Sequence, residues 1–300
     1  MKATTHAELY RPFKGTLRRL PLSALVLARS GIRTAFRSKK PLFLYAIPAM
    51  QMVATSFIVN LAFSIKSGAI GGDIGARGRL VGAALADAFT NVEQQIVMLL
   101  NSTQFFTLIV LAWYGAGLIA DDRRLKAHLL YFSRPVTQLG YILGKLLVVL
   151  FYGAMAIIVP ATMVLLVAIF SSPDWSFLHD RGWKIFAVEA YAFVWVLVHS
   201  LGILAISSLV TRKNHALVAA VGLFILTSAI AEFLAEVLDE ARWRMLSMFG
   251  NFDALAAEWL GVKQNGATWP VEQSYAVLGG TLLVSFAVLL RQVRKMEREA

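Results

Sequence analysis

Residues 146–173 read LLVVLFYGAMAIIVPATMVLLVAIFSSP and contain no charged side chain. A helix needs roughly 20 mostly apolar residues to cross the ~30 Å hydrocarbon core of a bilayer, so this stretch is long enough to span a membrane. The strands of a membrane barrel alternate in character over about ten residues, and this stretch does not alternate. It therefore predicts a membrane-spanning helix.

Five other charge-free runs accompany this stretch. The six runs lie between Lys40 and Lys66, Glu93 and Asp121, Lys145 and Asp174, Glu189 and Arg212, Lys213 and Glu232, and Glu272 and Arg291. We expect an all-α polytopic membrane protein, a single transmembrane domain over 1–300, with spans at about 41–63, 96–120, 143–170, 185–210, 215–238 and 273–291. Pro48 and Pro160 are expected to kink the first and third spans.

The composition supports the same class of protein. The chain of 300 residues is 58% hydrophobic and 16% charged, with a mean hydropathy of +0.64. That is too little polar surface to coat a water-soluble globule of this size. The chain has no cysteine, which excludes disulfides and thiolate metal sites.

The net charge of +11 is divided unevenly between the two sides of the predicted membrane. With the N-terminus inside, 21 basic residues fall on one side and 8 on the other. Cytoplasmic loops carry the excess of Lys and Arg, so both termini are expected in the cytoplasm. In a soluble protein such a charge would indicate nucleic-acid binding. Here it indicates orientation, and we expect no nucleic-acid partner.

Residues 22–38 predict an amphipathic helix before the first span. Arg29, Arg33 and Arg37 recur at a spacing of four, beside apolar residues. Such a helix can lie in the inner headgroup region with its guanidinium groups on lipid phosphates, so membrane lipid is an expected partner. A basic segment that only fixes topology is the alternative.

Polar residues inside the predicted spans are candidates for lining a path. They are Gln51, His199 and Glu232. Polar groups in a membrane find partners and face protein, so helix-to-helix hydrogen bonding is the alternative for Gln51 and His199. Glu232 and Glu236 lie one turn apart toward the outer end of their span, where interfacial carboxylates that meet water are the alternative to a proton or cation site.

No catalytic, metal or nucleotide site is expected on this chain. Gly140-Tyr-Ile-Leu-Gly144-Lys145 has three residues between the glycines and Leu after the lysine. A phosphate-binding loop needs four residues there and then Ser or Thr. The five histidines have no spacing typical of metal ligands.

Two polar connections carry the remaining expectations. The segment 121–135, Asp-Asp-Arg-Arg-Leu-Lys-Ala-His-Leu-Leu-Tyr-Phe-Ser-Arg-Pro, predicts a short amphipathic cytoplasmic helix, with Leu125, Leu129 and Phe132 on one side. It either docks into a groove on a soluble partner or merely fixes topology. Residues 252–260 have apolar side chains at helical spacing, and they predict an amphipathic helix on the outer interface, capped by Asn251 or Asp253.

The stretch 117–145 resembles a known family. Gly117-Leu-Ile-Ala-Asp-Asp-Arg-Arg124, then Leu130-Tyr-Phe-Ser-Arg-Pro135 and Gly144-Lys145, look like the permease subunits of ATP-binding cassette (ABC) transporters of the type-two exporter class. The resemblance implies that about 121–134 form a coupling helix seated on a separate ATPase subunit, which holds the ATP and magnesium. It implies these contact residues: Asp121, Asp122, Arg123, Arg124, Lys126, Phe132 and Arg134.

The resemblance also implies the setting of the protein. A second permease, identical or homologous, would face the first in the cell membrane, which we expect to be a bacterial inner membrane, and the pair would export a substrate. One alternative is an ABC-driven subunit that acts mechanically on a periplasmic partner, as in the maturation of nitrous-oxide reductase. The other is a proton-coupled secondary transporter that uses Glu189, Glu232 or His199.

Overall fold

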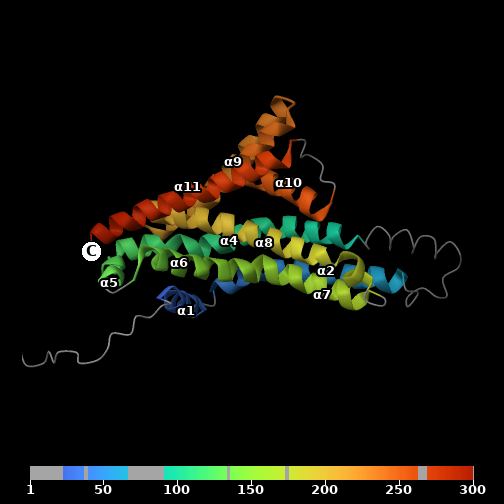
Figure 1. Ribbon diagram of the computed structural model, residues 1–300, viewed down its shortest axis with the longest axis horizontal. Helices are drawn as coiled ribbons and strands as arrows, with labels where there is room; N and C mark the ends of the chain where they lie inside the picture. Colours follow the sequence, from blue (N-terminus) through green and yellow to red (C-terminus); the bar gives the residue numbers. More distant parts are fainter. Residues whose placement is uncertain are drawn as a thin grey trace, which may run out of the picture.

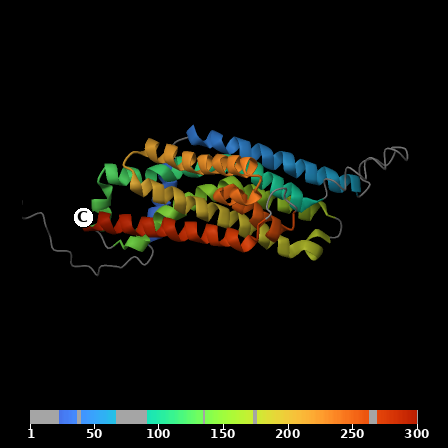
Figure 2. The same cartoon turned by 90° about the horizontal axis from the view of Figure 1, so that it is seen from above.

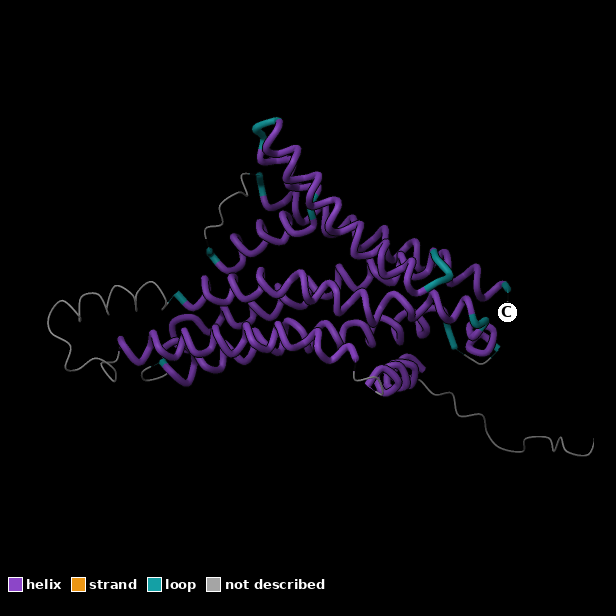
Figure 3. The backbone as a smooth tube through the Cα atoms, turned by 180° about the vertical axis from the view of Figure 1, so that it is seen from behind, coloured by secondary structure: helices purple, strands orange, loops and turns teal. Residues whose placement is uncertain are grey.

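The computed structural model describes residues 23–36, 40–66, 91–133, 136–172, 176–262 and 269–299. Every regular element in these ranges is a helix (Figure 3). Six helices are long and apolar enough to cross a membrane: Phe43–Ile65, Val92–Arg124, Gln138–Ser171, Arg181–Leu209, Lys213–Val237 and Val271–Arg298. The predicted all-α class is therefore confirmed, and the number of helices long and apolar enough to span a membrane equals the six predicted spans, although several of these helices extend beyond the predicted span limits.

Most of the long helices run roughly along the long axis of the molecule, whereas the helix Lys213–Val237 leans away from the others (Figures 1 and 2). In chain order they are α1 Ser23–Phe36, η2 Lys40–Tyr45, α2 Ala46–Lys66, α4 Val92–Arg124, α5 Ala127–Phe132, α6 Gln138–Gly153, η3 Ala154–Ile158, α7 Val159–Ser171, α8 Ser176–Leu209, α9 Lys213–Val237, η5 Ala241–Leu246, α10 Met248–Leu260 and α11 Val271–Arg298. One end of the bundle, the α5 end, holds α5 and the C-terminal end of α11 (Figure 1). The other, the α7 end, holds the ends of α2 and α7.

The centre of the bundle is made by α4 and α8. In the most apolar window of α8, 72% of the residues are buried, against 17% in α9 and in α2. Trp195 and Tyr191 of α8 are fully buried there. The apolar side chains of α2, α9 and much of α11 face outward, as expected for helices that contact lipid or another subunit.

The third span is interrupted where its proline lies. A single π-helical turn, η3, separates α6 from α7, and Pro160 is the second residue of α7. Proline has no N–H to donate to the preceding turn and its ring crowds that turn, so a widened turn accommodates it. Pro160 was predicted to kink the third span, and the irregularity that the structure shows directly before it is this π-helical turn. Pro48 lies in the first turn of α2, where proline is tolerated.

Helix α10 packs inside the bundle, so the prediction that it rests on the outer interface is wrong. Phe252 is fully buried, and its ring contacts Tyr191, Trp195 and His199 along about two turns of α8. The cap also differs from the prediction, because the Ser247 side chain accepts the Gly250 N–H. These contacts join residues far apart in sequence, which the local pattern of 252–260 does not contain.

A buried carboxylate ties two helices together at the α7 end. Glu93, in the first turn of α4, is 3% exposed. Arg181 and Lys184 of α8 donate to it at 2.8 and 2.9 Å. Arg181 is also where α8 departs from helical geometry, with φ −133° and ψ 15°. The two cations therefore fix the kink of α8 against the start of α4.

Replacing Gly153 tests the close approach of three spans. A Cβ there would lie 2.5 Å from Val196 Cγ1 and 2.7 Å from Leu111 Cδ2. Gly153→Ala is expected to destabilise the fold by about 1–3 kcal/mol through overpacking. The matched Gly222→Ala, whose Cβ meets nothing within 4 Å, is expected to stabilise it by about 0.5–1 kcal/mol. Unfolding midpoints in detergent compare the two, and equal midpoints would contradict the packing described here.

Candidate partner-docking corner at the α4–α5 junction

The second span continues through Arg124 and then turns sharply into α5. The Leu125 N–H closes α4 by donating to the carbonyls of Asp121 and Arg123. Lys126 then takes a left-handed conformation, with φ 54°. A non-glycine residue there ends a helix, so the predicted single helix over 121–134 is wrong. Residues 121–124 are the last turn of α4, and α5 is a separate helix of six residues.

Asp122 faces the interior, so its predicted role as a surface contact is not supported by its position. Its Oδ2 lies 2.7 Å from Lys145 Nζ and accepts the Tyr141 hydroxyl at 2.6 Å. The Asp122 and Lys145 side chains are only 14% and 11% exposed. The ammonium also lies 5.4 Å from the ring centres of Tyr131 and Tyr141. This cluster joins the end of α4 to α5 and the start of α6.

The inner face of α5 is held by a buried histidine and two aromatic rings. His128 is 6% exposed, with Nδ1 3.3 Å from the Asp122 carbonyl and Nε2 4.0 Å from a carboxylate oxygen of Glu299. The Phe132 and Tyr131 rings pack against Tyr141, with centres 5.5 and 5.7 Å apart. Helix α5 is therefore fixed to α4, α6 and α11, and Phe132 contributes to that packing.

The outer face of the junction is apolar with a basic border. Leu125 and Leu130 are 68% and 70% exposed. Arg124 and Lys126 beside them are also exposed, and Arg124 pairs with Asp121 at 3.3 Å. We call Arg124, Leu125, Lys126 and Leu130 the corner surface. Arg123 instead donates to the Ser208 carbonyl, and Arg134 lies outside the described residues.

The structure places two of the three predicted arginines of α1. Arg29 and Arg33 lie on its exposed face, and Arg37 lies outside the described residues. The opposite face packs on α6, where a Cβ at Gly31 would lie 2.7 Å from Val148. The predicted helix over 22–38 is seen as Ser23–Phe36.

The predicted path-lining residues lie on three different helices. Gln51 of α2 is half-buried, and its Oε1 has no partner among the described residues. His199 of α8 is fully buried, with Nδ1 2.8 Å from the Trp195 carbonyl. Glu232 of α9 is exposed and accepts from Arg244 at 2.9 Å. Within the described ranges, no hydrogen bond or ion pair joins any two of the three.

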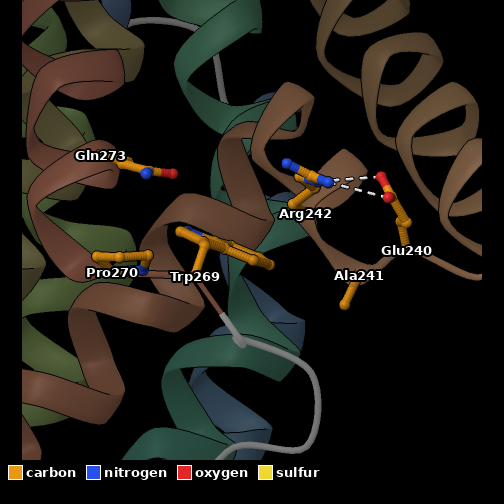
Figure 4. Close-up of a pocket in the computed structure, with 6 residues that line it drawn as sticks. All are labelled: Glu240, Ala241, Arg242, Trp269, Pro270 and Gln273. Carbon is orange, nitrogen blue, oxygen red and sulfur yellow. Dashed lines mark hydrogen bonds and ion pairs between the residues drawn. The ribbon is translucent and has the colours of Figure 1, made fainter.

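A hollow lies far from the corner surface, between η5 and the start of α11 (Figure 4). It measures about 340 Å³ and is lined by Glu240, Ala241, Arg242, Trp269, Pro270 and Gln273. Arg242 and Glu240 form a two-point ion pair, which lowers the pKa of the Glu240 carboxyl and leaves the hollow without net charge. Within the described ranges no group of His, Asp and Glu is arranged to hold a metal ion.

Sequence reasoning missed the partners that make the corner rigid. In the sequence, Lys145 served as the limit of a charge-free run and as part of the Gly144-Lys145 pair, and His128 served as one of five histidines and as part of the 121–135 segment, but neither residue was given a partner. A signal was available for Lys145, because a lysine inside an apolar helix needs a counter-charge. None of the local patterns identifies Asp122 as that counter-charge, because they do not fix which way Asp122 faces.

The sequence matches no model of a known protein family, and no curated protein matches it either. The relation to ABC permeases therefore rests on the resemblance of residues 117–145. The geometry of the corner surface is independent of that resemblance.

Removing one partner of the buried ion pair tests its structural role. Asp122→Asn leaves the Lys145 ammonium buried without its counter-charge, which is expected to cost about 3–5 kcal/mol. The double variant Asp122→Asn/Lys145→Met should recover most of this loss. Arg124→Gln, which breaks an exposed pair, should cost at most about 1 kcal/mol. Unfolding midpoints in detergent measure all three, and a small loss for Asp122→Asn alone would refute the assignment.

Proposed function

We propose that this chain is the membrane-spanning permease subunit of an ABC exporter of the type-two class, and that the corner surface binds a separate ATPase subunit. The observation that carries the proposal is a rigid junction with two outward leucines. Leu125 and Leu130 expose apolar area at a helix end where basic residues gather. Such area fits a pocket on a soluble partner. The resemblance of residues 117–145 supports the nature of that partner.

The proposal assigns ATP and magnesium to the partner, because the sequence contains no phosphate-binding loop. The α5 end would face the cytoplasm of a bacterial inner membrane. Basic residues of α11 at that end, Arg294, Lys295 and Arg298, agree with this orientation. The exposed face of α1, with Leu25 and Arg29, would contact anionic lipid.

A second permease subunit would cover part of the outward apolar surface. Val218, Leu226 and Phe233 of α9 are 68%, 60% and 62% exposed. Only 17% of the most apolar window of α9 is buried within one chain, so its outward apolar face is free to pack against a second subunit. The transport path would then lie between the two subunits. Lipid would cover the remaining outward face, including that of α2.

Movement would pass from the ATPase to the spans through α4. This helix is continuous over 33 residues from Val92 to Arg124, which corresponds to about 50 Å. A displaced corner would carry α4 with it, and the Asp122–Lys145 pair would carry α6. Nucleotide-driven closure of the ATPase would then bias two arrangements of the spans and extrude the substrate.

The contacts give less support to a proton-coupled transporter. Glu232 pairs with Arg244, and Glu189 accepts the Thr162 hydroxyl at 2.7 Å. His199 is enclosed by Trp195 and the phenylalanines Phe224, Phe249 and Phe252. These three candidate carriers are thus not joined in a relay. A mechanical subunit would use the hollow beside η5 to contact a periplasmic partner.

Disrupting the corner surface tests the proposed function. Tagged chain purified from its native membrane should retain a co-purifying protein that hydrolyses ATP and carries a phosphate-binding loop. Leu125→Asp/Leu130→Asp should abolish the co-purified ATP hydrolysis, because charge replaces the apolar anchors. Arg123 is left unchanged because it bonds the Ser208 carbonyl.

The control is Leu139→Asp, which adds one aspartate at an exposed position outside the corner surface and should retain the ATPase. It is compared with each single variant, Leu125→Asp and Leu130→Asp. Retention of the ATPase by the double variant would exclude the corner as its docking site. Absence of any ATPase from the wild-type preparation would contradict the proposed function. A periplasmic protein in the wild-type preparation would favour the mechanical alternative.

A further inference from the structure

Ser207 of α8 hydrogen-bonds to the main chain of the neighbouring span. It is fully buried, and its hydroxyl donates to the Ala116 carbonyl of α4 at 2.7 Å. The same oxygen accepts from the N–H groups of Ala120 at 3.1 Å and Ile119 at 3.3 Å. One hydroxyl therefore donates to a carbonyl and accepts from N–H groups of the same turn of α4.

This arrangement differs from the usual one for serine in a helix. A serine hydroxyl in a helix interior commonly bonds a carbonyl three or four residues earlier in its own chain. Ser208, the next residue and equally buried, does so by donating to the Ala205 carbonyl at 2.6 Å. Ser207 instead crosses to α4, so two adjacent serines make an internal comparison.

The close approach of the two helices makes this contact possible. A Cβ at Gly115 would lie 2.9 Å from Ile203, and Ala116 and Ala120 are fully buried. Small residues let membrane helices come near enough for side chains to reach the opposite backbone. Ser207 thus lies in an interface built from small side chains.

A second contact lies one to two turns further along α4. The Arg123 guanidinium donates to the Ser208 carbonyl, one of the last carbonyls of α8. A cation at a helix C-terminus satisfies a carbonyl that has no partner in its own helix. Both contacts join the last turn of α8 to the last three turns of α4, directly before the corner surface.

We propose that Ser207 is a positioning residue and that, with Arg123, it forms a clasp that makes the α5 ends of α4 and α8 move as one body. A displacement of the corner would then reach the fourth span as well as the second. Only the source of that displacement rests on the proposed function, because the clasp itself belongs to the isolated chain.

The natural absence of cysteine allows a direct test. Nitroxide labels at Leu125→Cys and Leu209→Cys, both exposed positions, report the separation of the corner from the end of α8. The Arg123 contact holds these segments close, so dipolar broadening of the spectrum measures their separation in nanodiscs. The labelled chain is expected to give one narrow distribution of distances.

Ser207→Ala should broaden the distribution of label-to-label distances, and Ser207→Ala/Arg123→Gln should broaden it more. Ser208→Ala removes an equally buried hydroxyl and should lower the unfolding midpoint by a similar amount while the distribution stays narrow. Ser207→Thr, which keeps a hydroxyl, should restore the narrow distribution. If Ser207→Ala does not fold, Arg123→Gln alone tests the clasp. It should broaden the distance distribution, whereas the control Arg124→Gln should leave it narrow.

A narrow distribution in the folded Ser207→Ala/Arg123→Gln variant would overturn the clasp. Broadening of equal size in Ser208→Ala would also overturn it, because general loosening would then explain the change. These measurements use no ATPase. A missing ATPase in the co-purification would therefore refute the proposed function without affecting the clasp. A distance distribution that stays narrow in the Ser207→Ala/Arg123→Gln variant, beside a bound ATPase in the wild-type preparation, would refute only the clasp.

Discussion

Hydrocarbon offers no water to the N–H and C=O groups of a polypeptide, so each of them must find a partner within the protein. The constraint explains why all regular elements of the described ranges are helices. It also explains how the irregular points are treated. The turn before Pro160 widens into a π-helix, and the Ser247 side chain caps α10 inside the bundle. The buried Ser207 hydroxyl likewise finds its partners within the protein, on the backbone of α4.

Charge is subject to the same constraint, and here it serves to fix helix ends. Asp122 and Lys145 neutralise each other at the α5 end, and Glu93 receives Arg181 and Lys184 at the α7 end. Each cluster joins helices that are neighbours in space. An unpaired charge at these buried positions would cost more than either pair gains, so the pairs determine which helices meet there.

The predictable part of the fold depends on local properties. Bilayer thickness sets a run length, so six charge-free runs were enough to predict six spans. The helix over 121–134 was predicted wrongly because the left-handed turn at Lys126 depends on the packing of α5. The inward direction of Asp122 depends on Lys145, which lies one span further along. Likewise, α10 is buried because of residues of α8, and the amphipathic pattern of 252–260 alone does not identify the surface that its apolar face meets.

A surface that transmits force must be rigid behind and accessible in front. At the corner, His128 and the Asp122–Lys145 pair hold α5 from behind. On the exposed side, charges alone would raise the rate at which a partner protein associates but would not fix its orientation on the corner surface. Screened surface charges affect association rates more than they affect the geometry of the complex. Two leucines can fix the register, since apolar side chains seated in pockets supply the central binding energy of an interface. Leu125 and Leu130 flank the left-handed turn, so a partner that holds both also grips the junction between α4 and α5.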